Sequence, residues 1–424
     1  MIDLKLLREH PEDVERGIQT KGYTVDISHI LELDAKKREL QGHVEAIAAQ
    51  KNAASAEIAK ASIEERKRLL KALQKVDAKA DASAERLDAL TKEFDAALWT
   101  VPNLPASDVK VGKDETENEV LRTWGEIPQF PFVPKAAWEL GPRLGAFDVE
   151  RAARVSGARF AYLTGAGARI ELALLNHAMR TLIAEGFIPV TPPVLVNAKA
   201  MEAMGYTLHG GKDETYYLER DDQYLVGTSE QSIGPMHMGE VLREADLPKR
   251  YVAFSTCFRR ESGSYGRDTK GIFRVHQFNK VEMFSFTTPE QSDAEHEYLL
   301  GLEERFLQAL ELPYQVVKMC TGDLGVPAAR KYDLEVWFPS ERRYRELTST
   351  SSCTDWQARR LNIRYRPSEG GGKPRFVHTL NGTAWSMNRP ICAILEHGQQ
   401  ADGSVVLPKA LRESFGAERI APVQ

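Results

Sequence analysis

The sequence predicts an α+β protein that begins with a helical arm. Apolar side chains recur at alternating steps of three and four over residues 30–98, a heptad pattern typical of a coiled coil. Residues 120–424 instead mix strand-like runs with helical ones, which indicates an α+β domain built on an antiparallel sheet. With 424 residues, the chain has room for two or three domains and a large core.

The composition is that of a globular protein from a reducing compartment. Hydrophobic residues make up 42% and charged residues 28%, and no apolar run approaches the ~18 to 20 residues that span a bilayer. The N-terminus has neither a signal-peptide core nor transit-peptide character. The four cysteines form no CxxC pair, which argues against a disulfide framework and a structural zinc site. We therefore expect a cytoplasmic protein with no membrane association and no zinc.

The arm is predicted as two antiparallel helices. Lys37 and Lys51 interrupt its apolar seam, and Ser62-Ile63-Glu64-Glu65 has the form of a capping box that begins the second helix. Two helices of roughly 35 residues, at 1.5 Å per residue, give an arm about 50 Å long. The same pattern would also suit a dimerisation rod.

Five basic residues gather near the predicted tip of the arm: Arg66, Lys67, Arg68, Lys71 and Lys75. The overall net charge of −5 gives no sign of a nucleic-acid partner, so any such binding must be local. A basic cluster could hold a phosphate backbone, although it is more often a solvated helix face. Pro102 and Pro105 end the second helix. We expect an arm domain over 1–100, a linker over 101–118 and a second domain over 119–424.

Residues 251–286 are predicted to form a hairpin with a long polar loop. Strand-like runs at 251–258 and 272–284 flank a loop that contains three glycines. An alternation of period two places Arg274, Phe278 and Glu282 on one face of the second strand. A sheet would not bury unpaired charge there, whereas a solvated face with weak ion pairs is an equally good interpretation of the spacing alone.

The residue types favour a binding site over a solvated face. The guanidinium group of arginine can donate two hydrogen bonds to a phosphate, an aromatic ring can stack on a base, and a carboxylate can pair with an ammonium group. The runs Phe258-Arg259-Arg260-Glu261 and Arg274-Val275-His276-Gln277-Phe278 resemble motif 2 of the class II aminoacyl-tRNA synthetases. Together with Lys280-Val281-Glu282, the sequence of these runs is similar to that of the seryl enzymes within that class.

This resemblance implies an antiparallel-sheet class II catalytic domain that binds ATP, L-serine and tRNA(Ser). The implied reaction forms seryl-adenylate and transfers the seryl group to tRNA, with tRNA(Sec) left open as a second acceptor. The N-terminal coiled-coil arm, with its basic cluster, would embrace the tRNA. Gly186 to Leu195, after an apolar helix, resembles motif 1 with Pro193 at its fixed proline, and implies a homodimer seam. Prolines favour an edge strand, and a simple helix–strand connection is the alternative.

The resemblance also assigns the remaining site residues. Serine binding falls on Thr228, Ser229, Glu230, Arg259, Glu282 and Thr383. By itself, Thr228-Ser229-Glu230 would more often be an ordinary turn or helix cap. ATP binding falls on Arg259, Arg260, Glu261, Arg274, Val275, Phe278, Glu346, Leu347, Thr348, Ser349 and Arg389. Arg259, Arg274 and Arg389 would be catalytic, and Glu346 and Ser349 would hold Mg²⁺ with the phosphates of ATP, because that ion prefers oxygen ligands.

The chain departs from the family pattern at three positions. Ser352 replaces a usual asparagine, and Ala384 and Asn388 replace glycines of motif 3, which ends with Arg389 stacked on the base. Two other classes of protein remain as alternatives. A catalytically silent tRNA-binding paralogue would have no need of the charged site residues. A ligase that loads a carrier protein would lack the arm.

Overall fold

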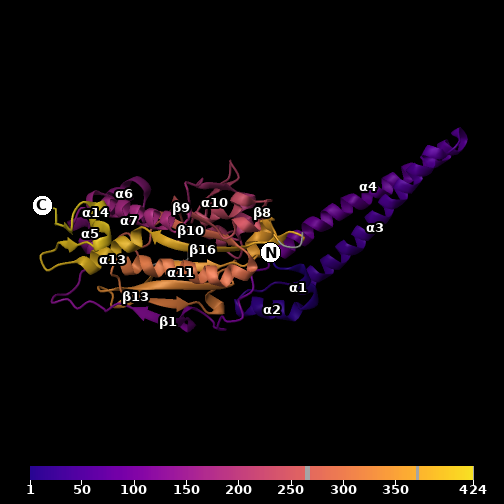
Figure 1. Ribbon diagram of the computed structural model, residues 1–424. Helices are drawn as coiled ribbons and strands as arrows, with labels where there is room; N and C mark the ends of the chain where they lie inside the picture. The colour runs from indigo at the N-terminus through magenta and orange to yellow at the C-terminus, as the bar shows by residue number, and fades with distance from the viewer. Residues whose placement is uncertain (263–267, 369–371, 424) are drawn as a thin grey trace. The chain divides into compact units, whose positions relative to one another are not determined.

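The computed structural model describes residues 1–262, 268–368 and 372–423, without the side chains of residues 72 and 75 (Figure 1). The predicted loop of the hairpin therefore lies partly outside the described residues, as does the side chain of Lys75. The chain forms two compact units, one of residues 1–19 with 23–102 and one of residues 20–22 with 103 onward. No described helix is both long and apolar enough to cross a membrane.

The first unit consists of α1 (Leu4–Glu9), α2 (Pro11–Thr20), α3 (Ile27–Lys60) and α4 (Ile63–Trp99). The predicted antiparallel helix pair is confirmed by the packing of α3 on α4. Ser62 caps α4, with its side chain accepting from the Glu65 N–H. The lysines that interrupt the seam are paired across it, Lys51 with Asp77 at 2.6 Å and Lys37 with Asp95 at 3.7 Å. The polar interruptions thus fix which residues of the two helices face each other.

The second unit is built on an eight-stranded sheet. In spatial order its strands are β1 (Glu119–Trp124), β11 (Tyr314–Lys318), β12 (Arg330–Phe338), β13 (Arg343–Ser352), β16 (His378–Ser386), β10 (Gln277–Thr287), β9 (Lys249–Phe258) and β4 (Ile188–Val190). All neighbours are antiparallel except β4, which lies at the edge and runs parallel to β9. The expected α+β class with an antiparallel sheet is confirmed.

Ten α-helices accompany the sheet in the described part of this unit. They are α5 (Ala137–Arg143), α6 (Val149–Ser156), α7 (Gly165–Ala184), α8 (Ala198–Met204), α9 (Gly211–Glu214), α10 (Glu230–Ile233), α11 (Ser292–Ala309), α12 (Trp356–Leu361), α13 (Asn388–Gly398) and α14 (Lys409–Phe415). The helix α11 packs on β16 and β13, and its Phe306 ring meets the Trp385 ring at 5.4 Å (Figure 1). Apolar residues of α7, α11 and α13 form the core with the sheet.

Within the described ranges, short strands form four smaller sheets. Their strands are β15 (Arg375–Phe376), β14 (Arg364–Arg366) and β8 (Val241–Arg243); β5 (Leu195–Asn197), β7 (Gln223–Leu225) and β6 (Tyr216–Leu218); β17 (Val405–Val406) and β18 (Arg419–Ile420); and β2 (Phe147–Asp148) and β3 (Tyr162–Leu163). The segment from Gly186 to Leu195, predicted to contain one strand, is divided between β4 and the start of β5, which belong to different sheets.

Candidate active site

The hairpin β9–β10 lies at the centre of the candidate site. The two strands pair antiparallel with Phe258 opposite Gln277. The expectation that Arg274 lies on the second strand was wrong, because β10 begins only at Gln277. Arg274 nevertheless reaches the site from the segment before β10, and its Nη1 donates to Glu261 Oε2 at 2.7 Å. Glu261 lies beyond the end of β9 with a φ of 53°, and it lines the site from the segment after that strand.

Two cavities of about 460 and 220 Å³ meet at four charged residues: Arg259, Glu261, Arg274 and Arg389. The larger is also lined by Thr228, Gln231, Tyr206 and Phe258. The smaller is also lined by Val275, Phe278, Lys280, Lys331, Glu346, Leu347, Thr348, Ser349 and Thr383. The Arg259 guanidinium lies over the Phe278 ring at 5.3 Å. Residues predicted from four distant segments of the sequence therefore line one connected surface.

Arg260 is an exception among the predicted ATP-binding residues. It lines neither cavity, and its Nε donates to the Thr215 carbonyl at 3.1 Å with the guanidinium 5.0 Å from the Tyr216 ring. Arg259 faces the cavities while the next side chain along the chain points elsewhere, as expected for neighbouring residues in extended backbone. The structure does not bring the Arg260 side chain to the site.

A β-bulge brings Glu346 and Ser349 to the same side of β13. Residues three apart on a regular strand point to opposite faces. Here the pairing with β12 skips Leu347, since Glu335 is opposite Glu346 and Leu334 is opposite Thr348. The extra residue reverses the alternation, so both Glu346 and Ser349 line the smaller cavity.

A second bulge acts in the same way on β16. Its register with β10 moves from Trp385 opposite Val281 to Thr383 opposite Glu282, and so skips Ala384. Glu282 and Thr383, both predicted to bind serine, are thereby direct cross-strand neighbours. Ala384 occupies the bulge and is fully buried, so a methyl group is accommodated where the family pattern has glycine.

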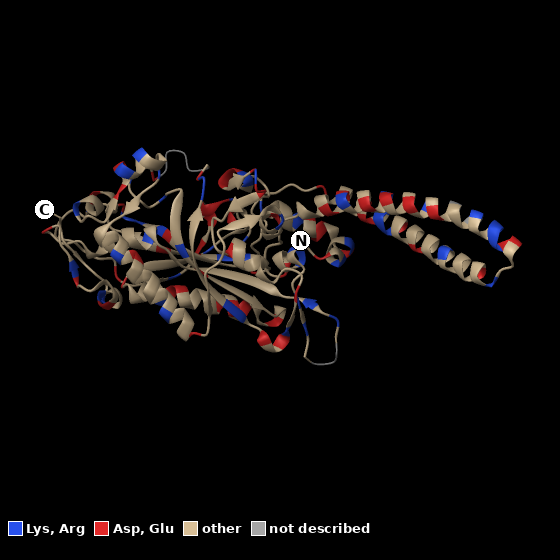
Figure 2. Cartoon of the chain, turned by 90° about the horizontal axis from the view of Figure 1, so that it is seen from above, with Lys and Arg blue, Asp and Glu red and all other residues tan. Residues whose placement is uncertain are grey.

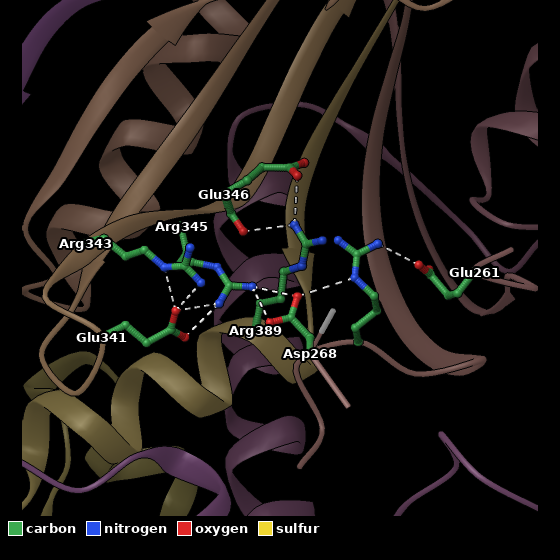
Figure 3. A network of polar contacts seen from close by, with 8 residues as sticks. Glu261, Asp268, Glu341, Arg343, Arg345, Glu346 and Arg389 are labelled. Carbon is green, nitrogen blue, oxygen red and sulfur yellow. Dashed lines mark hydrogen bonds and ion pairs between the residues drawn. The ribbon is translucent and has the colours of Figure 1, made fainter. Parts of the chain in front are cut away.

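Figure 3 shows how acidic side chains hold the site arginines. Arg389 Nη1 donates to the Glu346 carbonyl at 2.9 Å and lies 3.1 Å from its carboxylate. Asp268 accepts two bonds of 2.8 Å from Arg345 and lies 3.5 Å from Arg274 Nε. Burial opposes ionisation of Glu346, but the charges of Arg389 and Lys331 outweigh it and lower its pKa to about 2. Glu346 is therefore a carboxylate at neutral pH, and its side chain is 40% exposed.

The floor of the site is a buried polar cluster. Glu230 accepts from the Tyr206 hydroxyl at 2.6 Å and from Gln357 Nε2 at 3.1 Å. Lys280 Nζ donates to Thr228 Oγ1 at 3.2 Å and is ion-paired with Glu282. Of the expected serine-binding residues, Thr228 and Glu282 are therefore joined through Lys280, and Glu230 belongs to a second group with Tyr206 and Gln357. Ser229 is fully buried.

The buried carboxyl groups of this cluster resist ionisation. Burial raises the pKa of Glu282 to about 7, the charge of Glu230 adds to the effect, and Lys280 opposes it. Burial also raises the pKa of Glu230, against the hydrogen bonds from Tyr206 and Gln357. A ligand that brings a positive charge to this floor would therefore favour the ionised form of both carboxyl groups.

Sequence reasoning missed several residues of the site. Lys280 lies two residues before Glu282, so period two alone would have placed it on the same face of the strand. Tyr206 and Gln357 were not predicted as site residues, and nothing in their local sequence indicates their contact with Glu230. Lys331 and Asp333, 3.1 Å apart, adjoin Glu346, and burial raises the pKa of Asp333.

Two models of known families match the chain. The model of the tRNA synthetase class II core domain (G, H, P, S and T) matches residues 214–398, and that of the seryl-tRNA synthetase N-terminal domain matches residues 1–105. The antiparallel sheet with its arginine-rich site and the core-domain match define a class II aminoacyl-tRNA synthetase.

Curated relatives and solved structures narrow the class. Serine–tRNA ligase of Acidothermus cellulolyticus is 49% identical and that of Thermobifida fusca 47%, over 100% of this chain and 100% and 99% of theirs. The crystal structure of seryl-tRNA synthetase from Pyrococcus horikoshii complexed with ATP has a TM-score of 0.91 at 40% identity, with full coverage of both chains. The chain belongs to the seryl-tRNA synthetase family.

Proposed function

We propose that this chain activates L-serine with ATP to form seryl-adenylate and then transfers the seryl group to tRNA(Ser). The observation that supports this most is the convergence of arginines and acids on two connected cavities, the smaller of which is lined by Thr383, the cross-strand partner of the buried Glu282. Relatives that match over the full length bear the name serine–tRNA ligase, and the solved relative from Pyrococcus horikoshii is complexed with ATP. tRNA(Sec) is a second acceptor that the proposal leaves for experiment.

Catalysis would come from position and charge, without a protein nucleophile. The serine carboxylate attacks the α-phosphorus of ATP, the bond from that phosphorus to the bridging oxygen breaks, and pyrophosphate leaves. We assign Arg259 to the α-phosphate and Arg274 to the outer phosphates, where they balance the charge that develops. Arg274 is now paired with Glu261 and Asp268, so phosphate oxygens would take the place of those carboxylates. Arg389 lines both cavities and would stack its guanidinium plane on the base.

The residues present suit a magnesium ion beside the phosphates. Glu346 is an ionised, partly exposed carboxylate, and the bulge at Leu347 aligns Ser349 with it. Mg²⁺ commonly uses one or two protein carboxylates together with substrate phosphates. Glu346 and Ser349 would hold the ion, which would neutralise phosphate charge. No group of three or more His, Cys, Asp or Glu side chains that could hold a metal occurs in the described ranges.

Discrimination for serine would rest on hydrogen bonds to its hydroxyl. We assign Glu282 and Thr383 to hydrogen bonds with the serine hydroxyl, and Thr228 and Glu230 to contacts with its ammonium group. Alanine would leave these buried polar groups without partners, which can be worth a factor of ~10⁴ in specificity. Threonine keeps the hydroxyl and would have to be excluded by the shape of the pocket.

The arm and the sheet edge carry the proposed partners. We divide the chain into a tRNA-binding arm over 1–100, a linker over 101–118 and a catalytic domain over 119–424.

Near the end of the arm, where Lys and Arg gather in Figure 2, four basic residues are exposed and would contact the tRNA backbone: Arg66, Lys67, Arg68 and Lys71. Ile188 on the edge strand β4 is 45% exposed, and Leu172 and Ile183 on the preceding helix α7 are 63% and 48% exposed, which supports a homodimer seam along these elements. The four cysteines are unpaired, as suits a cytoplasmic enzyme.

Two assays together test the function. ATP–pyrophosphate exchange that depends on serine, followed by charging of tRNA(Ser), is expected. A silent paralogue would show neither activity, and a carrier-protein ligase would show exchange without charging. Sedimentation should give a dimer, and a stable, active monomer would contradict the proposed seam.

A further inference from the structure

One buried acid lies outside the site as described so far. Glu303 is on α11, is fully buried, and packs against the face of the sheet opposite to the cavities. Neither of its carboxyl oxygens has a hydrogen-bond partner of normal geometry within the described part of the chain. A buried carboxyl without a partner is costly, so its presence needs an explanation.

The place of Glu303 is defined by the strands above it. The ladder between β13 and β16 has three pairs and ends at Thr350 opposite Gly382. Beyond that pair the two bulges, at Leu347 and Ala384, alter the register of both strands. Gly382 has no side chain on the helix side, and a Cβ added there would lie 3.0 Å from Glu303 Oε1. The carboxyl thus reaches the backbone where the ladder stops.

Two groups at this gap could complete hydrogen bonds with Glu303. The Thr348 hydroxyl and the Thr383 N–H both favour its charged form, and Thr348 Oγ1 is itself buried without a well-formed partner. Burial nevertheless raises the pKa of Glu303 well above its ordinary value, and the charges of Glu282 and Asp333 act in the same direction. A neutral carboxyl has one donor and one acceptor, so it can accept from Thr383 N–H and donate to the Thr348 hydroxyl.

We propose that Glu303 is a positioning residue for the amino-acid pocket. From the helix side of the sheet, its carboxyl supports the backbone where β13 and β16 separate, and so holds Thr383 in the cross-strand pair with Glu282 that reads the serine hydroxyl. Glu303 acts through Thr383 and Thr348 and touches no substrate. This inference rests on the proposed roles of Glu282 and Thr383.

The test compares three variants of the full-length enzyme in serine-dependent ATP–pyrophosphate exchange. Glu303→Leu keeps much of the volume and removes both hydrogen-bonding functions, so the KM for serine is expected to rise about tenfold with the KM for ATP unchanged. Glu303→Gln retains a donor and an acceptor and is expected to restore most of the serine affinity. Leu307→Ala, a buried core change one turn further along α11, is the matched control: it should lower the melting temperature without altering the KM for serine.

A second variant approaches the same contact from the strand. In Gly382→Ala, the added methyl group would lie 3.0 Å from both Glu303 Oε1 and Met283 Cε, so the carboxyl would be displaced without being removed. The KM for serine should therefore rise as expected for Glu303→Leu, and Gly382→Ala tests the proposal if Glu303→Leu does not fold. Serine KM values within twofold of wild type in the folded variants, or an equal rise in the KM for ATP, would overturn the proposal. Glu282→Gln, measured alongside, distinguishes failure of the Glu303 proposal from failure of the proposed roles of Glu282 and Thr383. If that variant leaves the KM for serine unchanged, those proposed roles are wrong, whatever the Glu303 variants show.

Discussion

Serine binding should depend on pH through Glu282. Because burial raises the pKa of this carboxyl to about 7, it is half protonated in the empty pocket near neutrality. The carboxylate form of Glu282 can accept a charge-assisted hydrogen bond from the serine hydroxyl, whereas the protonated carboxyl forms a weaker one. With a pKa near 7, the ionised fraction is roughly 1/11 at pH 6 and 10/11 at pH 8, so the KM for serine should fall about tenfold over that interval.

Four charged or titratable groups near Glu282 influence its ionisation. Lys280 and Arg259 favour its charged form, while Glu230 opposes it, and Glu303 faces it through the sheet. The assay is ATP–pyrophosphate exchange at saturating ATP, with serine varied from about pH 6 to 8. Glu282→Gln should show a higher KM for serine and a weaker dependence on pH. A KM for serine that is constant over this range in the wild-type enzyme would refute the reasoning.

Three further perturbations have expected outcomes. Arg259→Ala should slow pyrophosphate exchange on the order of 100-fold, because a charge that balances the α-phosphate is lost; an exchange rate close to wild type would show that the assignment is wrong. Replacement of Arg66, Lys67, Arg68 and Lys71 by alanine should raise the KM for tRNA and flatten its dependence on salt, with exchange unaffected. Lys21 Nζ donates to the carbonyls of Asn103, Gly325, Val326 and Ala328 at 2.9 to 3.3 Å, so Lys21→Met should lower the free energy of unfolding by roughly 1–3 kcal/mol, measured with denaturant.

The sequence predicted secondary structure best where a regular pattern of side chains corresponds to a packed face of a helix or strand. The heptad seam located α3 and α4, and the cap at Ser62 marked the start of α4. The aromatic and β-branched residues of 251–258 located β9. The resemblance then named residues that line one connected surface, from Thr228 to Arg389.

The parts that sequence reasoning missed depend on departures from regular strands. Arg274 lies before β10, and the bulges at Leu347 and Ala384 decide which side chains face the cavities. A bulge is set by the register with a neighbouring strand, which no local pattern records. The contact between Glu230 and Gln357 likewise joins residues 127 positions apart through tertiary packing.

The recognition of serine is tested most directly by one competition of amino acids. Serine, alanine and threonine are compared by kcat/KM in ATP–pyrophosphate exchange for the wild-type enzyme and Glu282→Gln. We predict that serine is strongly preferred by the wild-type enzyme and that the serine-over-alanine ratio shrinks in the variant while the KM for ATP is unchanged. A variant with weakened use of ATP and the same serine-over-alanine ratio would contradict the assignment of Glu282 to the serine hydroxyl.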